Sequence, residues 1–83
     1  MTVKVGQVYR WVGDNPEDRY TLVITRVTNL GVCDYIYDDG MTVSDDDVDF
    51  VIQDKQLIAT YPTWIEAVCS HHFNPQKENI GEL

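Results

Sequence analysis

The chain has 83 residues, with 14 acidic side chains against 6 basic ones and a net charge of −8 at pH 7. A chain of this length buries one hydrophobic core only, and its 43% of hydrophobic residues is enough to build one. The negative charge disfavours direct binding to nucleic acid or to an anionic membrane, because unpaired carboxylates repel phosphate groups. Apolar runs are too short for a membrane span or a secretory signal, so we expect one small soluble domain.

The first half of the chain predicts β-strands separated by turns. Residues 7–12, 20–27 and 32–38 are rich in β-branched and aromatic side chains, which fit the half-buried surface of a sheet. Pro16 and Gly31 lie in the two intervening turns. Asp39 and Gly40 then predict a two-residue hairpin turn, after which residues 41–43 should pair back onto the third strand.

The second half predicts an acidic turn, two short strands and a helix. Residues 45–49 form the turn, and residues 50–53 and 56–60 are the expected strands. Thr63 and Glu66 match a capping box, which predicts a helix over residues 64–73. The side chains expected on its buried face are Ile65, Val68, Cys69 and His72.

Together these elements predict a mainly β protein, a small SH3-like half-open barrel of about five strands with one short C-terminal helix. The domain should span residues 1–75, and residues 76–83 are too polar to pack firmly and should form a mobile tail. Two cysteines in a chain without a secretory signal predict reduced thiols, with Cys69 acting as a small core side chain.

Two segments carry a resemblance to a known group of proteins. Residues 4–10 (Lys-Val-Gly-Gln-Val-Tyr-Arg) and 35–40 (Tyr-Ile-Tyr-Asp-Asp-Gly) resemble the first strand and central hairpin of small SH3-like barrel proteins encoded by phages and prophages. The resemblance covers about half of the chain, and the acidic residues 45–49 are not part of it. It implies an accessory protein of a bacterial virus, located in the cytoplasm of the host, and identifies no activity.

Metal-binding and catalytic motifs are incomplete in this sequence. A calcium loop starting at Asp45 would need Gly and Glu where the chain has Phe50 and Gln56. Cys33 has no neighbouring ligand that would complete a zinc site with Cys69. We therefore expect no metal, no cofactor and no enzymatic activity, and keep a small enzyme or metalloprotein as the third alternative.

The acidic residues are concentrated in the middle of the chain. No basic residue lies between positions 34 and 54, so these carboxylates have no partner of opposite charge within the segment. Such a segment predicts an acidic face that docks on a basic surface of a host nucleic-acid-handling protein and inhibits it, as a nucleic-acid mimic. A merely solvated surface is the simpler alternative. The partner-binding candidates are Asp34, Asp38, Asp39, Asp45, Asp46, Asp47 and Asp49, with Tyr35 and Tyr37 as aromatic anchors.

An aromatic patch is the second functional hypothesis. Tyr9 and Trp11 alternate on one expected strand, and Tyr35 and Tyr37 alternate on another, so each pair shares a face of the sheet. Such side chains would recognise a peptide or a cation, although aromatic side chains on adjacent strands also build cores.

Overall fold

The protein is described from a computed structural model, which places residues 3–13 and 20–71. Five antiparallel strands form one open sheet in the order β4-β3-β2-β1-β5, which confirms the mainly β fold. The strands are β1 (Gln7–Trp11), β2 (Thr21–Val27), β3 (Val32–Tyr37), β4 (Thr42–Asp47) and β5 (Lys55–Thr60). The helices are α1 (Val48–Ile52) and α2 (Trp64–Ser70).

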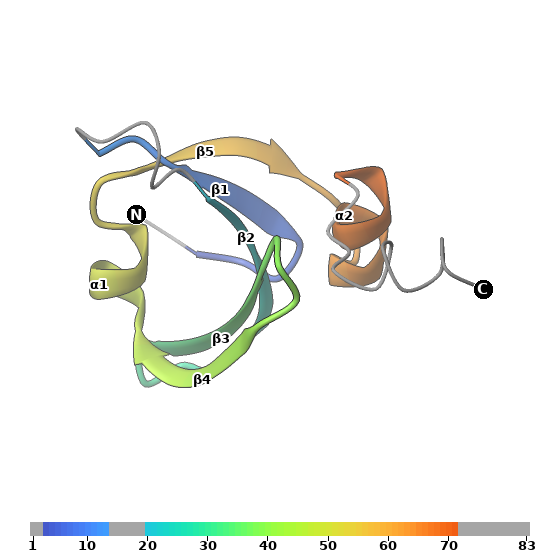
Figure 1. The fold of residues 1–83 in the computed structure, drawn as a ribbon. Helices are drawn as coiled ribbons and strands as arrows, with labels where there is room; N and C mark the ends of the chain where they lie inside the picture. Colours follow the sequence, from blue (N-terminus) through green and yellow to red (C-terminus); the bar gives the residue numbers. More distant parts are fainter. Residues whose placement is uncertain (1–2, 14–19, 72–83) are drawn as a thin grey trace.

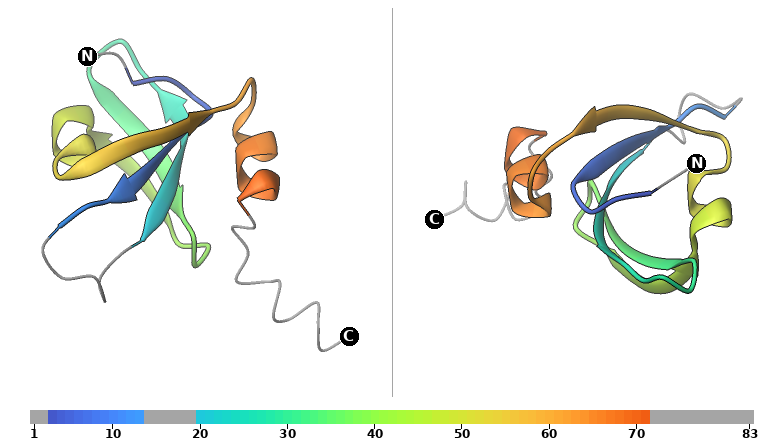
Figure 2. Two further views of the ribbon diagram at one scale, coloured as in Figure 1. Left: turned by 90° about the horizontal axis from the view of Figure 1, so that it is seen from above. Right: turned by 180° about the vertical axis from the view of Figure 1, so that it is seen from behind.

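The sheet is strongly bent, and a helix lies on each side of it. Figure 1 shows β3 and β4 curving away from β1 and β5, with α1 across the open side and α2 against the outer side. The same arrangement is visible from behind in Figure 2. Register shifts in the β1–β5, β2–β3 and β3–β4 pairs mark β-bulges, which bend strands and increase their twist. β4 and β5 remain the two edges of the sheet.

Alternating side chains fill one core on each face of the sheet. On β2, Leu22 and Ile24 point to the concave face while Val23 points to the outer face, and all three are fully buried. The concave core also contains Tyr9, Cys33, Tyr35 and Val51. The buried residues of the outer core are Val8, Val23 and Ala67, and α2 covers this core through Ala67 and the partly buried Val68.

Gly6 joins three parts of the chain just before β1. Its N–H donates to the Ile24 carbonyl at 2.9 Å, and its carbonyl accepts from the Tyr61 N–H at 3.0 Å. Its φ is +91°, and a Cβ built there would lie 2.2 Å from the Tyr61 carbonyl oxygen. The position therefore requires glycine both for its backbone conformation and for its space.

The structure corrects three predictions in the middle of the chain. The hairpin has three residues rather than two, because Gly40 donates to the Tyr37 carbonyl and Tyr37 donates to the Met41 carbonyl. Residues 45–47 belong to β4 and are not a turn. Residues 50–52 lie in α1 and are not a strand, because Asp47 caps a helix whose buried residue Val51 packs on the concave core.

Helix α2 begins as predicted but ends earlier and buries a different face. The Thr63 hydroxyl accepts from the Glu66 N–H at 3.1 Å, which confirms the cap. The helix ends at Ser70; its buried residue is Ala67, and the predicted Val68 packs beside it on the outer core. Ile65 is 58% exposed and Cys69 is exposed as well, so the prediction that they pack in the core is wrong. The expected positions 72–73 of the helix and the tail at 76–83 lie outside the described residues.

The two cysteines occupy opposite environments, which predicts a large difference in reactivity. Both are free thiols; Cys33 is buried and Cys69 is exposed. Burial, with Asp46, Asp34 and Asp47 nearby, raises the pKa of Cys33 to about 11. At pH 8 only about one Cys33 thiol in a thousand is then ionised, and the thiolate is the reactive form.

We therefore expect one fast and one slow thiol in a kinetic assay with a disulfide reagent. Cys69→Ser should remove the fast phase without loss of stability, since the side chain is exposed. Unfolding in urea should make Cys33 react fast. Two fast thiols in the folded wild type would contradict the burial of Cys33.

Neither helix in the described part of the chain is long and apolar enough to cross a lipid bilayer.

Candidate functional site: an aromatic groove

Four aromatic rings form a continuous row at one end of the concave face. The rings of Trp11 and Tyr20 are stacked, with centroids 5.7 Å apart and planes 10° from parallel. Tyr20 meets Tyr37 edge to face at 5.0 Å, and Tyr37 meets Tyr35 in the same manner at 5.3 Å. These are the favourable geometries for aromatic pairs, so each ring fixes the next.

The sheet register explains why these rings meet. Trp11 ends β1 and donates its backbone N–H to the carbonyl of Tyr20, immediately before β2, at 2.9 Å. On the other side of β2, Tyr37 pairs with Leu22. Tyr20 is two residues before Leu22, and such diagonal neighbours are within reach of aromatic side chains. The row therefore crosses three adjacent strands.

The row lines a hollow of about 350 Å³ that we call the aromatic groove. Helix α1 provides its opposite wall through Phe50 and Val51, and Phe50 is 65% exposed. The complete lining is Trp11, Tyr20, Tyr35, Tyr37, Phe50, Val51, Gln53, Asp54 and Lys55. Its volume lies near the lower end of the range for small-molecule pockets, and its walls are mostly apolar with a few polar groups.

A second hollow of about 250 Å³ adjoins the aromatic groove, because Tyr20 and Tyr37 line both. Its other walls are Asp38, Asp39 and Met41 of the β3–β4 hairpin. Met41 is 59% exposed. The two hollows together make an aromatic surface with an exposed apolar side chain and carboxylates beside it.

Lys55 is the only cation that lines the groove in the described structure. It pairs with Trp11 across β1 and β5, and its Nζ lies 5.5 Å from the ring centroids of both Trp11 and Tyr20. These distances are within the range of cation–π attraction. Burial lowers the pKa of Lys55, and the charges of Asp54 and Asp46 oppose that shift.

Gly13 allows the Trp11 indole to lie close to the backbone at the end of β1. A Cβ at position 13 would be 2.1 Å from the indole ring. The indole Nε1 is buried and has no hydrogen-bond partner among the residues described. The ring is thus held by packing and by its contact with Tyr20.

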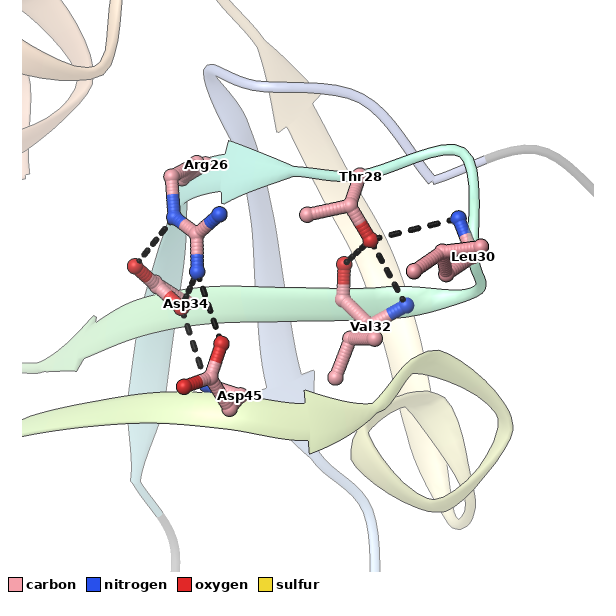
Figure 3. Close-up of polar contacts among 6 residues, drawn as sticks. All are labelled: Arg26, Thr28, Leu30, Val32, Asp34 and Asp45. Atoms are coloured by element: carbon pink, nitrogen blue, oxygen red, sulfur yellow. Dashed lines mark hydrogen bonds and ion pairs between the residues drawn. The ribbon is translucent and has the colours of Figure 1, made fainter.

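On the outer face of the sheet, Arg26 binds two of the predicted acidic residues, Asp34 and Asp45, as Figure 3 shows. It donates from Nε and Nη2 to the Asp34 carboxylate at 2.7 and 3.0 Å, and from Nη2 to Asp45 at 2.8 Å. The Asp45 N–H also donates to Asp34 at 2.9 Å. Asp45 has a φ of +59° at the bulge of the β3–β4 pair. The basic partner missing from the acidic segment therefore comes from β2, and it lowers the pKa of Asp34.

Most of the other predicted acidic residues have local structural contacts. Asp46 accepts from the Tyr35 hydroxyl at 2.7 Å, and Asp47 caps α1 by accepting from the Asp49 N–H at 2.8 Å. Asp38 and Asp39 accept backbone N–H groups of Thr21 and Met41 at 3.1 and 2.9 Å. Their charges remain on the surface, but their positions are explained by the fold.

The aromatic residues predicted from sequence separate into core and groove. Tyr9 is 2% exposed and donates to Gln7 Oε1 at 2.9 Å, so it belongs to the core. Tyr35 is 4% exposed, and burial followed by its bond to Asp46 raises its pKa. Trp11 and Tyr37 line the groove.

Sequence reasoning did not identify Tyr20, Phe50 or Lys55 as site residues. Tyr20 carried a usable signal, because it is the first residue of the second expected strand, and antiparallel pairing of that strand with the one containing Trp11 would bring the two side chains close together. The sequence predicts a strand at Phe50, and Lys55 stands beside Trp11 only in the observed β1–β5 register. Within residues 3–13 and 20–71, no three potential metal ligands are grouped closely enough to hold an ion.

Comparisons with known proteins return no match for this chain among protein-family models, curated proteins or solved structures.

Proposed function

We propose that this protein is a non-enzymatic interaction module that binds an extended peptide segment of a partner protein in the aromatic groove. The observation that supports the proposal best is the row of four touching rings above a hollow of about 350 Å³. Aromatic side chains bind with little loss of conformational freedom, because they have only two side-chain torsions. Rings fixed by their neighbours lose still less.

The shape of the surface favours an extended peptide as the ligand. Two hollows that share Tyr20 and Tyr37 can accept successive side chains of one segment. Phe50 and Met41 add exposed apolar area beside them. Peptide grooves of this kind select apolar or proline-containing segments by pockets between aromatic side chains.

The charge around the groove favours a basic segment. Asp38 and Asp39 line the second hollow, and Asp54 lines the first. The net charge of −8 adds a field that accelerates the approach of positively charged partners. The preferred ligand therefore combines apolar side chains with arginine or lysine.

Selection from a random displayed peptide library tests this function. We expect enriched peptides that pair a basic residue with apolar residues and that compete with one another for one site. High salt should release part of the bound peptides from the protein but not all of them, since salt screens the charges and leaves the apolar contacts. Failure to enrich any sequence, or enrichment of acidic sequences, would contradict the proposal.

A second candidate is an acidic inhibitor, phage-encoded as the resemblance implies, that docks on a basic surface of a host nucleic-acid-handling protein. The observation that favours it is the edge position of β4, where Asp45 and Asp47 are exposed and continue into the exposed Asp49. Strand β4 leaves this carboxylate row accessible along one side of the sheet. Exposed charges of this kind act on association more than on dissociation.

Replacing Asp45, Asp46, Asp47 and Asp49 together by Asn tests this second candidate. Binding to a basic host protein should become slower by about tenfold at low salt, with little change in dissociation. Removing four like charges relieves repulsion, but it also weakens the contacts of Asp45 with Arg26 and of Asp47 with α1, so we expect no rise in the melting temperature. Unchanged association kinetics in a variant that still folds would contradict acidic docking.

A further inference from the structure

We propose that the surface formed by the Trp11 and Tyr20 rings binds a cationic group of the ligand, an alkylammonium or guanidinium, and that Lys55 occupies this position in the free protein. This inference rests on the proposed function and specifies how the ligand enters the groove. In it, Lys55 is a tethered substitute for the ligand and leaves the rings when the ligand binds.

The position of the Lys55 ammonium shows which kind of group these rings accept. Nζ is equidistant from the centroids of Trp11 and Tyr20, at 5.5 Å from each. The two rings are in contact with each other, and both distances are within the range of cation–π attraction, so the two rings together hold one cation. A ligand cation at the same point would be attracted by the same two rings.

The rings are the close partners of this ammonium. Among the described residues, no carboxylate lies within ion-pair distance of Lys55, whereas Arg26 has two such partners. Asp54 and Asp46 act on Lys55 only through their charge. Burial disfavours the charged amine, so moving it into water removes a cost as well as an attraction.

The strand position of Lys55 permits this exchange. Lys55 begins β5, which is an edge strand, and its backbone is anchored opposite Trp11. Its four-carbon side chain can turn to solvent by rotamer changes while the strand stays in place. After it leaves, Asp54 remains in the lining and supplies a negative charge beside the incoming cation.

Competition of this kind has a measurable consequence. An external cation can bind only those molecules in which Lys55 has left the rings. Its apparent affinity is therefore lowered in proportion to the fraction of molecules with free rings. Lys55→Met keeps most of the apolar side chain and removes the charge, so it should free the site. Lys4→Met is the matched control, because it changes the net charge equally at an exposed lysine that does not line the groove.

The experiment is titration with tetramethylammonium chloride, with sodium chloride compensating the ionic strength. A Trp64→Phe background makes Trp11 the only tryptophan, so its fluorescence reports the groove directly. We expect Lys55→Met to bind tetramethylammonium about fivefold more tightly than the background protein, and Lys4→Met to match the background within about twofold. Equal affinity of the two methionine variants, weaker binding by Lys55→Met, or no binding by either would overturn the inference.

Sodium acetate serves as the second probe. If Lys55 instead remained in place as a partner for an anionic ligand, acetate would change Trp11 fluorescence in the background protein and Lys55→Met would abolish that change. That result would overturn the inference and leave peptide binding by the groove intact. Tighter tetramethylammonium binding by Lys55→Met, without any selectable peptide, would instead support the cation site while contradicting the proposed function.

Discussion

Gly6→Ala is expected to destabilise the protein by about 3 kcal/mol, which is a large part of the total stability of a small domain. Alanine at a φ of +91° costs about 1 to 2 kcal/mol by itself. The Tyr61 carbonyl, 2.2 Å from the new Cβ, must also move. That movement weakens the bonds of Gly6 to Ile24 and Tyr61, each worth about 1 kcal/mol.

Gly31→Ala is the matched control for this substitution. Gly31 has a similar φ of +84°, but no atom lies within 4 Å of a Cβ built there. Gly31→Ala should therefore lose only the stability that a positive φ costs an alanine, about 1 to 2 kcal/mol. Urea unfolding of the two variants measures the difference through the transition midpoints. Equal losses would show that the close approach of residues 6 and 61 does not matter for stability.

Tyr37→Ala is expected to weaken peptide binding by about 10- to 100-fold, the effect of removing a central interface residue. Tyr37 lines both hollows and supports the rings of Tyr20 and Tyr35 from either side. Its loss therefore removes a contact and leaves its neighbours less fixed. Isothermal titration with a library-selected peptide measures the change, and thermal unfolding verifies that the variant is folded.

Two further variants make this prediction specific. Trp64→Ala removes a partly exposed aromatic side chain that lines neither the groove nor the second hollow, and it should bind the peptide as wild type does. Tyr37→Phe keeps the ring and should lose less than about threefold. If Tyr37→Ala binds normally, or if Trp64→Ala loses as much, the peptide does not bind in the aromatic groove.

The strands were predictable because their signals are local. The residues of β2 are mostly β-branched types that favour a sheet, and Leu22, Val23 and Ile24 are buried on its two faces. The extension of β4 through three aspartates was not predictable in this manner, because it depends on Arg26 from a strand 19 residues away. Tertiary contacts outweighed the local preference of aspartate for turns.

The two helices show different limits of sequence reasoning. Helix α1 comprises only five residues, and short apolar runs do not distinguish helix from strand. Asp47 followed by Val48 and Asp49 was nevertheless a usable cap signal. For α2 the cap was found, but its buried face depends on the sheet beneath, which accepts Ala67.

The aromatic groove was only partly predictable, since its members come from separate strands. Trp11 and Tyr37 were candidates because they are aromatic side chains on expected strands. Tyr20 and Lys55 join them through the pairing of β1 with β2 and β5, which determines the residues that lie beside Trp11. The acidic residues were conspicuous in sequence, yet several of them serve as caps and ion-pair partners within the fold.

The most direct test of peptide binding in the groove is amide chemical-shift mapping by NMR with a library-selected peptide. We expect the largest shifts at the groove residues of β1, β3 and α1 and at the start of β5, including Trp11, Tyr37, Phe50 and Lys55. Shifts confined to β4 around Asp45 and Asp47, with the groove unaffected, would contradict this expectation and favour acidic docking instead.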